Sequence, residues 1–394
     1  MANQALTLAT EPPIQAAGTS QAATSQLMEN PAYTRQQLIN YIGNKRGLSA
    51  PIDDAVMEVR QRLGGRKLRS MDLFSGSGFV SRLLKKHSNL VAANDLETYA
   101  HAISSCYLPD HSQQLSEKAA LLVNELNNAV ACGATRNGFV SQLYSPIDDQ
   151  NIRPGERVFY SNDNARRLDF YAQELQEVAP EIKRVLMGPL LAKASAHVNT
   201  GGVFKGFYKD KYTGVGKFGA AGGDSLKRIL APITLELPVT SNFSSAFEVY
   251  QQDANTLASE LSGFDLVYID PPYNQHPYGS NYFMLNLLVN YTAPSEISQV
   301  SGIPTNWNRS GYNVKRQALD LLVELFAKIP ARFLLVSFNS EGYVSTPEIK
   351  QALGEHGSVD EMVIQYNTYR ASRNLSGRPV HVNEHLFLLD RQAN

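Results

Sequence analysis

The sequence lacks several features that would each point to a particular class of protein. Only two of its 394 residues are cysteine, Cys106 and Cys132, and they form no C-x-x-C pair, so we expect neither a disulfide scaffold nor a metal site. No stretch approaches the roughly 18 apolar residues that are needed to cross a bilayer, which predicts no membrane partner. The first 34 residues contain no Lys or Arg and no apolar run, unlike a secretory or transit peptide.

The N-terminal segment is rich in Ala, Gln, Thr and Ser, a composition that cannot bury much apolar surface. We therefore interpret residues 1–34 as a disordered tail. We expect the protein to work in the cytoplasm.

A strong net charge is also missing, since the formal charge is −1. Proteins that follow phosphates are usually basic overall, so this balance does not by itself indicate a nucleic-acid binder. The stretch from Lys193 to Arg228 differs, because it carries seven Lys and Arg residues against two acidic ones. A basic surface is therefore concentrated in one part of the chain.

What is present is an ordinary globular composition, with 43% hydrophobic and 19% charged residues. Since single cores stop growing at roughly 250 to 300 residues, a chain of this length predicts two domains. Neither value separates an enzyme from a binding protein, so function has to be argued from sites.

Strand-like segments occur in two blocks of the chain. The first block predicts a strand, a glycine turn and a helix, the opening of a βαβ unit, and the second predicts a resumed doubly wound sheet ending in a hairpin of 361–366 with 385–389. The predicted strands are 68–74, 90–93, 247–251, 264–269 and 332–338. Between the blocks the pattern is mostly helical, with the glycine-rich stretch 201–223 too irregular for a packed element.

These patterns predict an α/β fold with a Rossmann-like doubly wound sheet. Residues 35–105 plus 245–394 form the predicted catalytic and cofactor-binding domain, and residues 106–244 form an inserted helical domain.

A glycine turn follows the first predicted strand in the segment Asp72-Leu-Phe74-Ser-Gly76-Ser-Gly78. Glycines at this place let the backbone approach a ligand at the carboxyl edge of the sheet. Asp95 ends the next strand, where it could accept hydrogen bonds from ribose hydroxyls or cap the following helix. A nicotinamide cofactor and S-adenosylmethionine satisfy this pattern equally well.

The segment Asp270-Pro271-Pro272-Tyr273 follows the apolar strand FDLVYI and decides between these cofactors. The exocyclic nitrogen of adenine is a poor nucleophile because its lone pair is delocalised into the ring. An enzyme must therefore accept its N–H groups and position the nitrogen. Asp270 can supply a carboxylate, Pro271 a carbonyl and Pro272 a rigid turn, while Tyr273 can stack on an extruded base.

A further segment, Tyr41-Ile-Gly-Asn-Lys45-Arg, precedes the first strand and taken alone indicates only a surface turn. Together with the glycine loop and the Asp-Pro-Pro-Tyr motif, in this order, it resembles the Dam-like (alpha-group) adenine-specific DNA methyltransferases. The resemblance covers about residues 38–105 and 245–390.

The resemblance implies a fold, a reaction and roles for particular residues. It implies S-adenosylmethionine as cofactor, methyl transfer to the N6 amine of adenine in duplex DNA, and residues 106–244 as a target-recognition domain. Catalysis falls to Asp270, Pro271, Pro272 and Tyr273. Cofactor contacts fall to Tyr41, Lys45, Asp72, Phe74, Gly76, Gly78, Asp95, Asp253 and Asp270.

Duplex DNA is the expected partner, with the target adenine flipped out of the stack. We expect Lys205, Lys209, Lys211 and Lys217, interleaved with Phe204, Tyr208, Tyr212 and Phe218, to form a mobile recognition loop; the alternative is a solvated charged loop. Arg370 and Arg373, in a second basic segment, are expected to clamp the backbone. The resemblance also implies that the enzyme acts as a monomer in a bacterial or phage-infected cell, and that a cognate restriction endonuclease can belong to the same system.

Three other functions remain open at this level. An RNA base or protein-amide methyltransferase would use related motifs, although an insert of this size favours DNA. A nicotinamide oxidoreductase would explain Gly76, Gly78 and Asp95 but leave Lys45 and Asp270 without a role. A catalytically silent DNA-binding protein would keep the basic insert but would not need a methyl-donor site.

Overall fold

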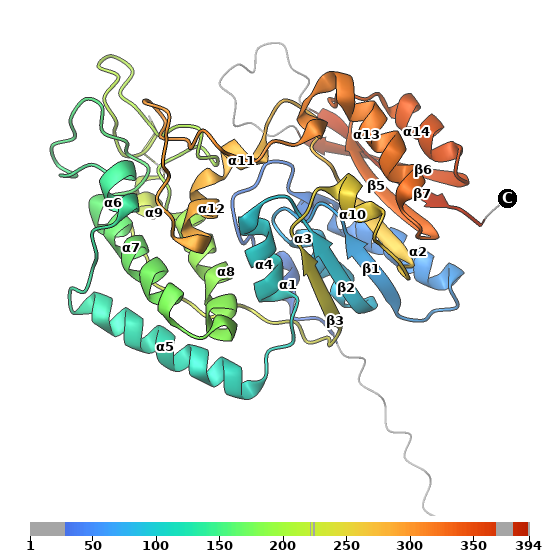
Figure 1. Cartoon of the computed structure of the whole chain (residues 1–394), viewed down its shortest axis with the longest axis horizontal. Coiled ribbons are helices and arrows are strands. Elements are labelled where there is room, and N and C mark those ends of the chain that lie inside the picture. The colour runs from blue at the N-terminus through green and yellow to red at the C-terminus, as the bar shows by residue number, and fades with distance from the viewer. Residues whose placement is uncertain (1–27, 221, 224, 368–380, 393–394) are drawn as a thin grey trace, which may run out of the picture.

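The computed structural model describes residues 28–367 and 381–392, apart from residues 221 and 224. A single sheet organises the chain, in the strand order β3-β2-β1-β4-β5-β7-β6 (Figure 1). Strands β1 to β5 pair in parallel, and β7 pairs antiparallel with both β5 and β6. The strands are β1 (Leu68–Asp72), β2 (Ser88–Asn94), β3 (Ala246–Tyr250), β4 (Leu266–Ile269), β5 (Phe333–Asn339), β6 (Ser358–Asn367) and β7 (His381–Asp390).

This arrangement confirms the predicted doubly wound α/β fold of an S-adenosylmethionine-dependent methyltransferase. The predicted strands are all present, with ends that move by one or two residues, and the predicted C-terminal hairpin forms in β6 and β7. The order reverses between β1 and β4, and ligands bind at the carboxyl ends of the strands at such a reversal. The fold therefore places Asp72, Asp95 and Asp270 at one edge of the sheet.

Both faces of the sheet are covered, because its central strands are apolar on alternate sides. In β4, Leu266 and Tyr268 pack on one face and Val267 and Ile269 on the other, the two-residue period of a strand. The first face is covered by α2 (Ser49–Arg62) and α3 (Phe79–Lys85). The second is covered by α10 (Ala254–Ala258), α13 (Lys315–Lys328) and α14 (Thr346–Gly354) (Figure 1).

The predicted insert is helical and lies beside the sheet, where α5, α7 and α8 occupy the left of Figure 1. It shares one apolar core with α4 (Thr98–Tyr107) and α12 (Phe283–Asn290), so the segment packs firmly against the rest of the chain. Its helices are α5 (Gln113–Ala131), α6 (Phe139–Tyr144), α7 (Asn162–Glu177), α8 (Pro180–Ala196) and α9 (Leu226–Leu230). The remaining elements are α1 (Pro31–Arg35), η1 (Lys45–Leu48), α11 (Tyr278–Asn281) and η2 (Gly311–Asn313).

Part of the predicted N-terminal tail is structured. Residues 1–27 lie outside the described residues, but residues 31–34 belong to α1 rather than to a disordered tail. Tyr33 is fully buried, and its hydroxyl donates to the carbonyl of Tyr107 at 2.7 Å. The prediction was wrong here because the segment's composition does not reveal that one aromatic ring anchors it.

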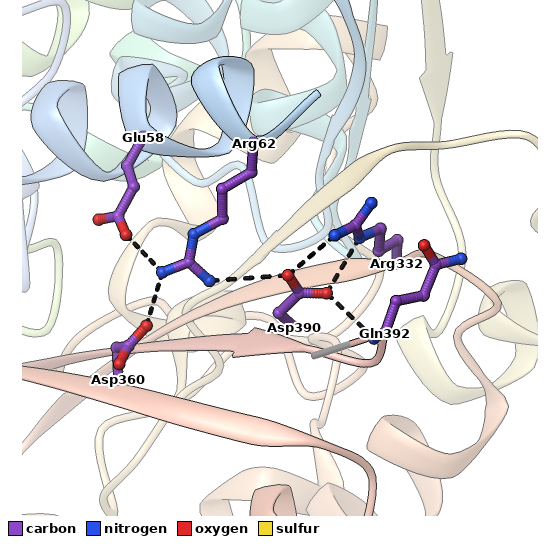
Figure 2. Close-up of polar contacts among 6 residues, drawn as sticks. All are labelled: Glu58, Arg62, Arg332, Asp360, Asp390 and Gln392. Carbon is purple, nitrogen blue, oxygen red and sulfur yellow. Dashed lines mark hydrogen bonds and ion pairs between the residues drawn. The ribbon is translucent and has the colours of Figure 1, made fainter. Parts of the chain in front are cut away.

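An ion-pair network joins α2, β6, β7 and the residue just before β5 at the amino edge of the parallel strands (Figure 2). Asp390, at the end of β7, accepts hydrogen bonds from Arg332 at 3.0 and 3.1 Å and lies 3.6 Å from Arg62 of α2. Arg62 also pairs with Glu58 and, at 2.7 Å, with Asp360 of β6. The network ties α2 and the C-terminal hairpin to the start of β5.

No helix in the described ranges is long and apolar enough to span a membrane.

Candidate active site and cofactor pocket

The glycine loop after β1 requires its glycines. Gly76 and Gly78 have φ angles of 49° and 70°, in the left-handed region that side chains disfavour. A Cβ on Gly76 would also lie 2.4 Å from the hydroxyl of Tyr41. The glycine loop and the segment that carries Tyr41 are separate motifs in the sequence, and in the structure they touch each other.

Asp95, after β2, holds the same loop from the other side. Its carboxylate accepts hydrogen bonds from the backbone N–H of Gly76 at 2.7 Å and of Glu97 at 2.9 Å. Burial raises the pKa of this carboxyl to about 6. Asp95 supports the start of α4, although the N-cap residue of that helix is Glu97. Asp95 also lines a pocket at this edge of the sheet.

Asp270 follows β4 and forms a buried ion pair with Lys45. Its Oδ2 lies 2.9 Å from Nζ of Lys45, and the two side chains are 17% and 5% exposed. Within the described part of the chain, Oδ1 of Asp270 has no hydrogen-bond partner. A buried acceptor without a partner costs free energy, so this oxygen is a candidate for contact with a ligand.

The pKa values of the pair follow from burial and charge. Burial raises the pKa of Asp270 to about 6, although the Lys45 ammonium acts in the opposite direction. The carboxylates of Asp270 and Glu384 raise the pKa of Lys45 against the effect of burial. Lys45 is therefore a fixed cation at neutral pH, while Asp270 gains a proton only in mildly acidic solution.

Tyr273 ends the motif and is held through both its backbone and its ring. Its carbonyl accepts a hydrogen bond from the N–H of Tyr343 at 2.8 Å, and its ring packs against Phe338, with ring centroids 5.7 Å apart. Nζ of Lys45 lies 5.7 Å from the centroid of the Tyr273 ring. The turn after β5 thus orients this aromatic side chain.

Tyr41 lies in a cluster of tyrosines. Its ring stacks on Tyr278 at 5.0 Å and on Tyr282 at 5.1 Å, and it meets Tyr99 edge to face. The hydroxyls of Tyr278 and Tyr282 bond the carbonyl and the N–H of Ile42, at 3.1 and 2.8 Å. Tyr278 of α11 and Tyr282, which follows it, therefore fix the segment that carries Tyr41, a role that the sequence did not predict for these tyrosines.

One pocket collects residues from all these segments. It lies at the carboxyl edge of β1, β2 and β4. The pocket is lined by Tyr41, Phe74, Asn94, Asp95, Leu96, Glu97, Gln252, Asp253, Ala254, Asp270, Pro272, Tyr278, Asn308, Ser310, Tyr312 and Asn313.

A smaller pocket shares Tyr41, Phe74 and Asp270 with the first and adds Lys45 and Asp72. Asp72 is buried, and its Oδ2 accepts from the hydroxyl of Ser81 at 2.6 Å. Its Oδ1 has no partner among the residues described, and burial raises the pKa of the carboxyl to about 7. Two carboxylate oxygens at the wall of the smaller pocket, Oδ1 of Asp72 and Oδ1 of Asp270, can thus still accept a hydrogen bond.

Asp253 and Glu97 complete the acidic lining. Asp253 caps α10 by accepting from the N–H groups of Asn255 and Thr256 at 3.0 and 3.1 Å. Glu97 accepts from Asn286 at 2.6 Å and from Asn308 at 3.3 Å, and burial raises its pKa to about 7. Glu97 was missed in the sequence, where its only signal was its position two residues after Asp95.

The pocket fits an elongated cationic nucleoside cofactor. Among its lining residues the carboxylates of Asp95, Glu97 and Asp253 can bind hydroxyl and amine donors, and the aromatic rings of Tyr41 and Phe74 offer stacking surfaces. The oxygens of Asp270, and of Asp72 in the adjoining pocket, that have no partner in the described structure favour a positive charge. These are the groups that S-adenosylmethionine, with its ribose, adenine and sulfonium, requires.

The basic segment of the insert forms a hairpin-like loop. Lys209 and Gly216 make an isolated antiparallel bridge, and Asp210 accepts from the N–H groups of Tyr212 and Thr213 to close the turn. Lys205, Lys209 and Lys211 are exposed and Lys217 is half-buried, and Tyr212 at the tip is 84% exposed. The lysines and Tyr212 thus reach solvent on one loop.

Phe204 and a second basic segment also belong to the predicted DNA contact surface. The prediction that Phe204 belongs to a mobile reading loop is wrong, because its ring is 1% exposed and packs on Phe159 and Phe283. Helical and glycine-rich patterns do not reveal that one aromatic residue anchors the base of a loop. The second basic segment, with Arg370 and Arg373, lies outside the described residues.

In the ranges that the structure describes, no group of three or more His, Cys, Asp or Glu side chains is placed to hold a metal ion.

Known proteins resemble this chain over most of its length. The chain is 27% identical to the type II methyltransferase M.NlaIII of Neisseria lactamica, covering 90% of this chain and 99% of that protein. It is 26% identical to the type II methyltransferase M.CviAII of Paramecium bursaria Chlorella virus 1, covering 89% and 98%. With M.FokI of Planomicrobium okeanokoites the identity is 25% over 90% of this chain, which spans 53% of that longer protein.

The sequence profile of D12 class N6 adenine-specific DNA methyltransferases matches residues 41–336, a range that contains every motif of the pocket. These enzymes take the methyl group from S-adenosylmethionine and modify DNA, which decides against the RNA, nicotinamide and silent-binder alternatives. The chain therefore belongs to the D12 class of N6 adenine-specific DNA methyltransferases.

Proposed function

We propose that Asp270 is the catalytic carboxylate, and that the carbonyl of Pro271 is the second acceptor for the N6 amine of a flipped adenine. The observation that carries this proposal is the buried Asp270 carboxylate at the pocket wall, with Oδ2 held by Lys45 and Oδ1 without a partner in the described structure. A hydrogen bond from N6 to Oδ1 draws the nitrogen lone pair out of conjugation with the ring.

S-adenosylmethionine supplies an electrophilic methyl group on a sulfonium. The N6 lone pair forms the new bond to the methyl carbon as the carbon–sulfur bond breaks, and positive charge moves to the nitrogen. The negative charge of Asp270 stabilises this charge as it develops. Oδ1 then lies where it can accept the proton that N6 releases, and the pKa of about 6 suits brief protonation.

Tyr273 is proposed to stack on the flipped base, with Pro272 holding the turn rigid. Its ring is backed by Phe338 and its carbonyl is held by Tyr343, so the stacking surface is set before DNA binds. Such preorganisation reduces the entropy lost on binding, which helps to offset the cost of unstacking a base.

The cofactor contacts are proposed by position in the pocket. Asp95 accepts from the ribose and Asp253 lies near the adenine of the cofactor. The glycines Gly76 and Gly78 do not line either pocket themselves, but their left-handed backbone shapes the loop whose Ser75 and Ser77 line the smaller one. Tyr41, Lys45, Asp72 and Phe74 line the smaller adjoining pocket together with Asp270.

Residues 106–244 are proposed as the target-recognition domain, and the lysine loop as the part that grips DNA. Replacing Lys209 and Lys211 together with alanine should weaken binding severalfold at moderate salt. It should also lower the magnitude of the slope of log affinity against log salt by about 2, because each lysine that contacts a phosphate displaces about one counterion from the DNA. Lys315→Ala, an exposed lysine on α13, is the matched control. An unchanged salt slope would mean that the lysine loop is a solvated charged loop that does not contact DNA.

We propose that the enzyme is site-specific and acts as a monomer on duplex DNA in the cytoplasm, within a restriction-modification or an orphan or phage methylation system. The relatives named type II methyltransferases support the restriction-modification setting. A cognate restriction endonuclease would then recognise the same sequence.

The reaction is tested by incorporation of labelled methyl from S-adenosylmethionine into plasmid DNA, with wild type compared with Asp270→Asn. Single-molecule sequencing of the product identifies the modified base and its context. We expect N6-methyladenine at one recurring motif and its loss in the variant. Methylation that persists in the variant would contradict the role of Asp270.

A further inference from the structure

A second buried carboxylate, Glu384, lies two strands away from Asp270 in the sheet. It belongs to β7, opposite Asn339 of β5, and is 6% exposed. Carboxylates are almost never fully buried unless they are paired. Within the described residues Glu384 forms no ion pair, and its Oε2 has no hydrogen-bond partner. Neither its burial nor its free oxygen is explained by folding of the hairpin.

The other oxygen of Glu384 begins a chain of contacts that ends at Tyr273. Oε1 accepts a hydrogen bond from Nδ2 of Asn339 at 2.7 Å. Asn339 in turn accepts from the N–H of Glu341 at 2.8 Å and of Gly342 at 3.0 Å, which closes the turn after β5. The next residue, Tyr343, donates to the carbonyl of Tyr273. Glu384 thus supports the turn that holds the stacking ring.

The charges give Glu384 a second effect. An Asp270 carboxylate paired with one ammonium would have little net charge, and so little power to stabilise a cationic nitrogen. A second carboxylate, close enough to raise the pKa of the same Lys45, adds an excess of negative charge around the Lys45–Asp270 pair. In a site of low dielectric this excess is felt strongly at the reacting atoms.

From this geometry we propose that Glu384 is a positioning residue for methyl transfer. It holds the turn after β5, which begins at Asn339, against Tyr273. It also adds negative charge around the Lys45–Asp270 pair. The inference rests on the proposed role of Asp270 and assigns a function to a strand that contributes no residue to either pocket described above. The pKa values agree with it, because Glu384 raises the pKa of both Lys45 and Asp270.

Glu384→Gln separates the charge from the shape. Glutamine keeps the volume and the carbonyl oxygen that accepts from Asn339, so the turn stays in place and only the charge is lost. We expect kcat to fall by about tenfold with little change in KM for DNA. We also expect the acidic limb of the pH profile of kcat to move to lower pH, because Asp270 loses a neighbouring negative charge.

The groups that face Asp270 include Lys45 of the N-terminal segment, Asp72 of β1, Tyr268 of β4 and Tyr278 of α11. None of them is changed in the variant, so the shift of the limb reports on Glu384 alone. Asn339→Ala keeps the charge and removes the link to the turn. It should raise KM for DNA severalfold without moving the limb.

Glu361→Gln is the matched control. Glu361 lies on the same hairpin but pairs with Lys350 and His385, both at 2.9 Å, and its loss should leave kcat and the limb unchanged. Thermal melting and S-adenosylmethionine binding verify that each variant is folded.

The outcomes separate the two proposals. If Asp270→Asn keeps full activity, the proposed function is wrong. If Asp270→Asn is inactive while Glu384→Gln has the wild-type kcat and an unmoved limb, the role of Glu384 is wrong. A lower kcat with the limb shifted to lower pH supports both.

Discussion

Asp270 and Asp390 are buried carboxylates at opposite edges of one sheet, and their surroundings differ in one essential respect. Asp390 receives two hydrogen bonds from Arg332 and one from the N–H of Gln392, and it lies near Arg62 (Figure 2). Asp270 has one lysine and an oxygen without a partner in the described structure. The pKa is lowered at Asp390 and raised to about 6 at Asp270.

The comparison shows how a buried charge can serve two purposes. A carboxylate whose acceptor sites are satisfied ties elements together. A carboxylate left short of donors costs stability but remains available to a substrate. The two carboxylates should therefore respond differently to the same substitution, one through catalysis and the other through folding.

The largest effect is expected for Asp270→Asn. Asparagine keeps the shape but loses the charge and one acceptor, so kcat should fall on the order of 10³-fold. The measurement is single-turnover methylation of a duplex oligonucleotide that contains the target site. Asp390→Asn serves as the control and should keep kcat near the wild-type value at a temperature where it is folded. Equal losses of kcat in both variants would contradict the proposed difference between a catalytic and a structural carboxylate.

Asp390→Asn should instead lower the free energy of unfolding by about 2 kcal/mol, because two arginines lose part of their acceptor. Urea unfolding at pH 7 measures this difference. A carboxyl with a lowered pKa stabilises the fold above its unfolded value, near 3.8, and this contribution is lost as pH falls through the folded pKa. The deficit of the variant should therefore shrink below about pH 4. A deficit that stays constant down to pH 3 would mean that charge is not its cause.

A smaller effect is the pH dependence of the wild-type reaction. At saturating cofactor and DNA, kcat should show an acidic limb at or below about pH 6, because the pKa of Asp270 is about 6 in the free protein and a bound cation can only lower it. Asp95 and Glu97, with pKa values of about 6 and 7, line the larger pocket, so their protonation should appear in the KM for S-adenosylmethionine instead. Because the folded pKa of Asp270 is raised, the native state binds its proton more readily. Its contribution to stability therefore declines as pH rises from about 4 to about 6. A kcat without an acidic limb would exclude Asp270 as the titrating group.

Several features of the site could be predicted because they depend on short stretches of chain. Apolar runs ending in Asp72 and before Asp270 are strands whose carboxyl ends lie at one edge. The glycine requirement at Gly76 and Gly78 follows from a sharp strand-to-helix turn and is present as left-handed backbone. The lysine loop was recognisable from its charge, although its anchor Phe204 was not.

Other features could not be predicted, because each joins residues that are far apart in the chain. The Lys45–Asp270 pair spans more than 220 positions, and the resemblance assigned a cofactor contact to Lys45 without naming this partner. The stacking of Tyr41 on Tyr278 and Tyr282, and the support of Tyr273 by Asn339 and Tyr343, have no local signal. Tyr33 looked like part of a tail for the same reason.

The sequence by itself therefore determined the class of fold, the glycine loop after the first strand and the Asp-Pro-Pro-Tyr motif proposed to meet adenine. These depend on local hydrophobic period, glycine conformation and the chemistry of four adjacent residues. Only the tertiary structure decided which carboxylates are satisfied and which remain available. Burial and partner count, which set the pKa and the free energy of a charge, exist only after distant strands have come together.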